Sequence, residues 1–353
     1  MNLGKYKALL SPLNQRRLAI FTANRRGLFS LFIFGFLFFI SLMAEVVAND
    51  KPIVVFFDGQ ILFPILKSYP ETRFGGEFPT EADYQDPYVV ELIQEKGQAI
   101  WPIIPYSYDT VVKSKTAERR ALVAPSRQHW LGTDDQSRDV VARLIYGFRT
   151  AVVFGLVLTL FSGVIGVTAG AIQGFFGGWI DLGFQRFMEI WQSFPMLYLV
   201  IILSSVIQLT FWWLLGILLL FSWMRYVGVV RAEFLRARNL DFVRAARALG
   251  VSDTFIMFRH VLPNAMVATI TFLPFNLSAA ITTLTGLSVL SFGLPPGSPS
   301  LGEMIVQGRN NIQAPWLGLT SFFTLGILLI LLIFVGEAVR DAFDPRKTLV
   351  SPN

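Results

Sequence analysis

The stretch RAARALGVSDTFIMFRHVLPN, residues 244–264, lies between two long apolar runs and contains three arginines, a glycine and a proline. On insertion scales, an arginine at the centre of a membrane helix costs about 2.5–3.5 kcal/mol. The stretch is therefore expected outside the bilayer, as a connection between two membrane-spanning helices. Its position outside the bilayer is the reference for placing the membrane-spanning helices on either side of it.

The composition indicates a membrane protein. Of the 353 residues, 53% are hydrophobic and 15% are charged, whereas soluble domains have about a quarter charged residues. The absence of cysteine excludes disulfides and thiolate metal sites, and the two histidines, His129 and His260, make a histidine-rich metal site implausible. A histidine-based catalytic triad could use only His129. The net charge of +6 is interpreted as membrane topology and not as a nucleic-acid site.

Six apolar runs reach the roughly 20 residues that a helix needs to cross the hydrocarbon core. They are residues 28–48, 151–175, 187–209, 211–230, 265–290 and 317–338. The first could be a signal peptide, but its length and the lack of a small-residue cleavage site favour an anchor. The third and fourth runs have almost no loop between them, which predicts a tight helical hairpin.

The basic residues predict the orientation. Six precede the first run with no acidic residue: Lys5, Lys7, Arg16, Arg17, Arg25 and Arg26. Residues 1–27 are therefore expected in the cytoplasm, and six crossings return the tail, residues 339–353, to the same side. The arginine-rich connection 231–264 is cytoplasmic by the same count.

Residues 49–150 are then external and are expected to fold. VVFFDGQILF, residues 54–63, predicts a β-hairpin in which Asp58 and Gly59 form the turn. Residues 86–97 predict a short helix with Asp86 as its N-cap, Pro87 in its first turn and Gly97 as its stop. No nucleophile, base and orienting group can be named there, which favours a structured lid without chemistry.

The connection 231–264 itself predicts a helix, a turn and a helix. Asn239 can cap the first helix, and Gly250 can end it in a left-handed conformation. Ser252 can cap the second helix, and Pro263 can begin the next membrane segment. The first helix carries one narrow apolar stripe, formed by Phe242, Ala245, Ala246 and Leu249. Such a stripe suits a groove on another protein; anionic lipid is the alternative partner, but alanines argue mildly against it.

The spacing Ala245-Ala246, three residues, Gly250, nine residues, His260, Val261, Leu262-Pro263 resembles the EAA loop of ABC importer permeases, E-A-A-x3-G-x9-I-x-L-P. Arg244 stands where that pattern has Glu, and His260 where it has Ile. The resemblance implies that the loop docks on an ATPase through Arg244, Ala245, Ala246, Leu249, Gly250, Val251, Ser252, His260, Leu262 and Pro263.

Further blocks resemble the C-type permeases of dipeptide and oligopeptide importers over residues 125–347 and the first run. These are HWLGTDDQSRDVVARLIYG (129–147), LSFGLPPGSPSLGEM (290–304), APWL (314–317) and GEAVRDAFDPRK (336–347). NDKPIVV (49–55), GGEFPTEADYQDP (75–87) and FLPFNLSAAITTLT (272–285) resemble the Yej-type branch, which takes up microcin C and peptides.

The resemblance implies an all-α integral membrane protein of the bacterial inner membrane with the type I ABC importer fold. It would have six transmembrane helices, a small mixed α/β external insertion between the first two, and a transmembrane domain over residues 151–338. The implied partners are a second permease, two ATPase domains or subunits, an external solute-binding protein, the peptide substrate and membrane lipid.

The chain has no G-x-x-x-x-G-K-[ST] phosphate loop. ATP and Mg²⁺ are therefore expected on the partner ATPases, and this subunit is expected to be no enzyme and to hold no metal or cofactor.

Polar residues inside the spans are candidates for the transport pathway. Arg225 could line it or could extend its guanidinium to the cytoplasmic interface. Asn276 and Thr282 are further candidates, although contacts between helices are the commoner role for such side chains. Gly166 and Gly170 form a G-x-x-x-G pair, whose partner could be another span of this chain or the second permease.

Three other functions compete with a transporter subunit. A membrane-embedded enzyme would need a cluster of acids, histidines or a nucleophile at one depth. A passive channel would need no docking loop, and a membrane-anchored scaffold would need no spans beyond the first. The ordered family blocks disfavour all three.

Overall fold

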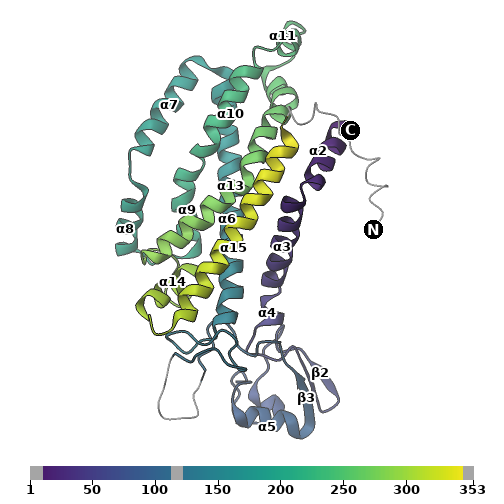
Figure 1. Ribbon diagram of the computed structural model, residues 1–353, viewed down its shortest axis with the longest axis vertical. Coiled ribbons are helices and arrows are strands. Elements are labelled where there is room, and N and C mark those ends of the chain that lie inside the picture. Colours follow the sequence, from purple (N-terminus) through teal and green to yellow (C-terminus); the bar gives the residue numbers. More distant parts are fainter. Residues whose placement is uncertain (1–10, 113–121, 345–353) are drawn as a thin grey trace.

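The computed structural model describes residues 11–112 and 122–344. It is a bundle of long helices with a small sheet at one end (Figure 1). The outermost parts of the two predicted cytoplasmic ends, residues 1–10 and 345–353, lie outside the described residues.

Within the described residues, five helices are long and apolar enough to cross a membrane, and a bent pair would make a sixth crossing. The helices of the bundle are α2 (Pro12–Ala23), α3 (Arg25–Leu42), α4 (Ala44–Val47), α6 (Val140–Phe176), α7 (Gly178–Gln192), α8 (Met196–Val206), α9 (Phe211–Ser222), α10 (Met224–Ala237), α13 (Leu262–Val289), α14 (Leu301–Asn310) and α15 (Pro315–Phe343). Each predicted span falls on one of these helices or on a consecutive pair.

Helix α6 begins at Val140, eleven residues before the predicted start of the second span at residue 151. Its first turns contain Arg143 and Arg149, and hydropathy excludes such charged residues from a predicted span. Both arginines are paired, because Arg143 contacts Glu303 at 3.0 Å and Arg149 contacts Glu45 at 2.8 Å. These ion pairs let the helix extend past the apolar run.

The third predicted span, residues 187–209, is broken. Helices α7 and α8 meet at an angle of 61° across Ser193, Phe194 and Pro195. Proline disfavours helical geometry in the residue before it and has no N–H for the helix ladder. Helix α7 also begins at Gly178, well before the predicted start.

The predicted hairpin is present, as β1 (Val54–Phe57) and β2 (Gln60–Leu62). Its turn residues, Asp58 and Gly59, have positive φ angles of 47° and 72°. The predicted helix is α5 (Pro87–Lys96), and the carboxylate of Asp86 accepts from the Tyr88 amide at 3.0 Å. Gly97 ends the helix as expected.

Gly97 also begins a third strand, β3 (Gly97–Ile100), which pairs antiparallel with β1 to give the order β2-β1-β3. Val55, Val89 and Ile93 join one buried cluster with Phe74, the last residue of the short 3₁₀ helix η1 (Glu71–Phe74). The sheet and α5 therefore share a small hydrophobic core.

The helix α11 (Asp241–Ala248) lies at the opposite end of the bundle from the sheet (Figure 1). Helix α2 lies at the same end as α11, where the Arg17 guanidinium covers the ring of Phe343, the last residue of α15, at 4.6 Å. The beginning and the end of the described chain therefore meet at the end that carries α11.

The glycines in the second half of α6 face α10 of the same chain. A Cβ added at Gly170 would lie 2.9 Å from the carbonyl oxygen of Val227, and one at Gly174 would lie 2.6 Å from that of Arg231. Gly166 faces Trp223 in the same way. The G-x-x-x-G pair thus packs within this chain, where the sequence left its partner open.

Candidate functional site

The elbow, defined here as residues 241–261, comprises α11, α12 (Asp253–Phe255) and the π-helical turn η2 (Ile256–Val261). Asp241 lies in the first turn of α11, where a carboxylate favours the helix dipole. The predicted cap is wrong, because Leu240 occupies the N-cap and makes no side-chain cap hydrogen bond. The Asn239 amide instead donates to the Leu235 carbonyl at 3.3 Å, back into α10.

Gly250 ends α11 as the sequence predicts. Its φ angle is +78°, and its N–H donates to the Arg247 carbonyl at 3.0 Å. The Val251 N–H donates to the Ala246 carbonyl at 3.1 Å. This pair of bonds is a Schellman motif, which requires a left-handed residue where Gly250 stands.

The second half of the elbow continues directly into α13. Ser252 Oγ accepts from the Phe255 N–H at 3.4 Å and so caps α12 as predicted. The chain from Asp253 to Val289 is one continuous helix, with Pro263 in the first turn of α13, where proline is tolerated.

The elbow has one buried side and one exposed side. Val243, Ile256 and Val261 are fully buried in a cluster with Phe175 of α6 and Phe234 of α10. Most of the predicted stripe points away from this cluster, because Phe242 is 44% exposed, Leu249 is 83% exposed and Ala245 is exposed, whereas Ala246 is half-buried against the cluster. Phe242, Ala245 and Leu249 therefore form an apolar surface that residues 11–112 and 122–344 leave uncovered.

The remaining predicted docking residues lie in the stripe or around it. Arg244, Ala245, Ser252, His260 and Pro263 are exposed, and Ala246, Val251 and Leu262 are half-buried. The Arg247 guanidinium bonds Asp253 at 2.8 Å and covers the Phe175 ring at 5.0 Å, which braces the two halves of the elbow.

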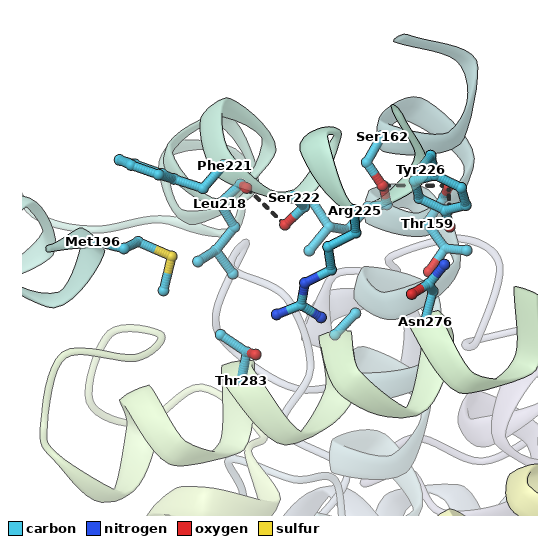
Figure 2. Close-up of a pocket in the computed structure, with 12 residues that line it drawn as sticks. Thr159, Ser162, Met196, Leu218, Phe221, Ser222, Arg225, Tyr226, Asn276 and Thr283 are labelled. Carbon is cyan, nitrogen blue, oxygen red and sulfur yellow. Dashed lines mark hydrogen bonds between the residues drawn. The ribbon is translucent and has the colours of Figure 1, made fainter. Parts of the chain in front are cut away.

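A second site is a cavity lined by residues of α6, α8, α9, α10 and α13 (Figure 2). Of the three candidate pathway residues, Arg225 and Asn276 line this cavity, whereas Thr282 is exposed elsewhere on α13. The neighbouring Thr283 lines it instead. Thr282 and Thr283 have the same hydropathy, so hydropathy cannot tell which of them faces the cavity. Successive residues of a helix point about 100° apart, and in the structure it is Thr283 that lines the cavity.

A buried network of charged side chains was not predicted. Asp134 accepts from Arg138 Nε at 2.8 Å, and Arg143, which is fully buried, contacts Asp134 at 3.4 Å and Glu303 of α14 at 3.0 Å. His129 Nδ1 lies 2.9 Å from the Asp139 carboxylate. The network joins the segment before α6 to α14, which is more than 150 residues away in the sequence.

Comparison with known proteins identifies the class. Residues 166–349 match the family described as the inner membrane component of binding-protein-dependent transport systems. The matched region begins within α6 and includes the elbow, α13 and α15. The chain belongs to this family of ABC transporter permeases.

Within the family, two relatives that match over nearly their full length are Yej-type permeases. The chain is 57% identical to the peptidoglycan transport system permease protein YejE of Agrobacterium fabrum, over 96% of this chain and 94% of the relative. It is 57% identical to the inner membrane ABC transporter permease protein YejE of Escherichia coli, over 96% and 99% of the two chains. The oligopeptide transport system permease protein OppC of Lactococcus lactis is 35% identical over 62% of this chain and 76% of the relative. These relatives are transport permeases, not enzymes.

Proposed function

We propose that this chain is the permease subunit of an ATP-driven importer that forms a membrane pathway for peptides or peptide-like compounds. It couples to a separate ATPase through the elbow. The observation that carries this proposal is the uncovered apolar stripe of α11, because Phe242 and Leu249 are exposed while Val243 of the same helix is fully buried. A helix that lays such a face into a groove is a common mode of protein recognition.

The stripe is presented on a rigid support. Val243, Ile256 and Val261 seat the elbow on the ends of α6 and α10, and the Schellman motif fixes the turn between its halves. A displacement of the elbow would therefore move α13, which is continuous with it. In this proposal, closure of the paired ATPase subunits biases the permease between inward-open and outward-open states.

The remaining parts of the proposal follow the expected orientation. The elbow, α2 and the end of α15 face the cytoplasm, and the sheet with α5 faces the external solute-binding protein. A second related permease completes the pathway, and ATP and Mg²⁺ bind to the ATPase chains. Two observations support this orientation. The residues before α3 are rich in basic side chains, which favour the cytoplasm. Helix α2 contacts the end of α15, so both ends of the described chain lie on the same side.

The names of the relatives guide the choice of substrate. The Agrobacterium relative is named for peptidoglycan transport, and the Lactococcus relative is named for oligopeptide transport. Peptides, including those derived from peptidoglycan, are therefore the proposed substrate class, with microcin C-like compounds as a further candidate.

The test uses two substitutions in the elbow. Gly250→Pro removes the N–H that bonds the Arg247 carbonyl, and it cannot adopt the positive φ. Ala246→Trp adds bulk within the stripe, at its half-buried edge. Both should abolish peptide uptake and co-purification of the ATPase, while the chain still inserts in the membrane.

Ala248→Trp is the matched control, because Ala248 lies in the same helix two positions away, about 200° around its axis. It should retain more uptake than Ala246→Trp. Persistent uptake and stoichiometric ATPase in both test variants would contradict the docking assignment.

A further inference from the structure

The cavity of Figure 2 lies at the middle of the bundle, at the same depth on three helices. Thr159 is near the midpoint of α6, and Asn276 is near the midpoint of α13. Arg225 is near the midpoint of the apolar helix Phe211–Ala237. The polar lining is therefore concentrated where the surrounding bilayer would be most apolar.

Arg225 is the only charged residue among the described residues that line this cavity. The other arginines of α6 and α10, which lie nearer the ends of the two helices, have carboxylate partners: Arg143 with Glu303, Arg149 with Glu45, Arg231 with Asp181 and Arg236 with Glu233. No carboxylate in residues 11–112 and 122–344 pairs with Arg225 in this way. An arginine inside a membrane is expensive and usually faces a partner or a water-filled space.

The guanidinium of Arg225 faces the cavity. Residue 230, the predicted cytoplasmic end of this span, lies five residues beyond Arg225, which is about 8 Å at 1.5 Å per residue. The side chain nevertheless extends across the cavity toward Thr283 (Figure 2). In the structure it is therefore placed for a ligand in the cavity.

The hydroxyls of Ser222 and Thr283 do not compete with the guanidinium as donors in the cavity. Ser222 Oγ donates to the Leu218 carbonyl at 2.8 Å, and Thr283 Oγ1 donates to the Ala279 carbonyl at 2.8 Å. Their protons are thus committed to the backbone of their own helices. Arginine presents its N–H groups in a planar fork that matches both oxygens of a carboxylate.

The size of the cavity restricts what enters it. Its volume of about 80 Å³ holds several waters, and so accommodates one carboxylate group and not a whole peptide. Met196 and Phe221 add apolar surface beside the polar wall (Figure 2). The arrangement suits the end of a peptide, with the rest of the ligand in the open pathway.

We infer that Arg225 binds the C-terminal carboxylate of the peptide during its passage through the permease. This inference rests on the proposed function and goes beyond it by naming the ligand group and the residue that recognises it. Every unmodified linear peptide carries this group, so the site recognises a substrate feature that is independent of side-chain sequence.

The test compares trialanine with trialanine amide in proteoliposomes that contain the complete transporter and saturating binding protein. Affinities of the binding protein for both peptides are measured separately, so that differences at that step are removed. The unaltered transporter should import the free acid about tenfold faster than the amide, as expected for one lost charge-assisted hydrogen-bond pair.

Arg225→Met should lower import of the free acid about tenfold, to the level of the amide, and leave import of the amide unchanged. Arg225→Lys, which keeps the charge but loses the fork, should restore part of the preference. Arg186→Met is the control, because Arg186 is an exposed arginine of α7 paired with Glu189, and its loss should leave the preference intact.

Three results would overturn the inference. Equal loss for both peptides in Arg225→Met would assign Arg225 to the architecture or to a carboxylate of the second permease. Unchanged import of both peptides would show that it contacts neither. If the unaltered complex imported neither peptide with ATP, the proposed function would fail, and the carboxylate site would fail with it.

Discussion

The Arg143 guanidinium of α6 lies 3.0 Å from the Glu303 carboxylate of α14, and the arginine is fully buried. The same guanidinium donates to the carbonyls of Tyr108 and Ser298, each at 3.2 Å. One side chain thus joins the segment before α6, the loop before α14 and α14 itself.

This pair should be strongly coupled. Arg143→Met and Glu303→Gln each leave an uncompensated charge in the network, so each should destabilise the chain by about 3–5 kcal/mol. The double variant should lose less than the sum of the two, with a coupling of about 0.5–3 kcal/mol. Melting temperatures of the four purified proteins in detergent test this, and strictly additive losses would show that the contact contributes nothing of its own.

The contact between α6 and α10 should not tolerate even a methyl group. A Cβ at Gly170 would lie 2.9 Å from both the Val227 carbonyl and the Val230 Cβ, so Gly170→Ala must push the helices apart. We expect a loss of about 1–3 kcal/mol, as for other overpacked sites. Gly228→Ala is the control, because nothing lies within 4 Å of its added Cβ. Thermal unfolding of both variants should separate them, and equal melting temperatures would contradict the packing.

The two sides of α11 should respond differently to the same substitution. Leu249→Ser removes exposed apolar surface, so it should weaken ATPase association while the chain retains its own melting temperature. Val243→Ser places a hydroxyl in a fully buried cluster, so it should destabilise the elbow by about 1–3 kcal/mol. Co-purification and melting are measured on both variants. Normal ATPase recovery with Leu249→Ser would show that the stripe is not a docking surface.

Much of the fold could be predicted from local sequence. Apolar runs located every long helix, because the length of a membrane-spanning helix is set by the bilayer. Gly250, Ser252 and the Asp58-Gly59 turn were predicted correctly, because each depends on a backbone conformation or cap that the residue itself favours. The existence of the exposed stripe also followed from helical spacing.

Features that depend on distant contacts could not be predicted in this way. The start of α6 at Val140 depends on Glu303 and Glu45, which neutralise its two arginines. The third strand needed β1 as its partner, and the partner of the G-x-x-x-G pair had to be located in space. Pro195, by contrast, was a local signal for the break between α7 and α8 that the long apolar run concealed.

For Arg225, local sequence supplied one part of the prediction and the three-dimensional structure supplied the other. Its charge within an apolar run marked it as a candidate, but a span ending at residue 230 left the interface within reach. In the structure its side chain lines the cavity.

The unbroken helix from Asp253 to Val289 has a mechanical consequence. Pro274 offers no N–H to the Ile270 carbonyl, so bending is easiest there. About 30 Å of helix separates that pivot from Asp253, but only about 3 Å separates it from Asn276. A rotation about Pro274 would therefore move Asp253 roughly ten times as far as Asn276. A wide movement of the elbow would become a short movement of the cavity wall, with a correspondingly larger force.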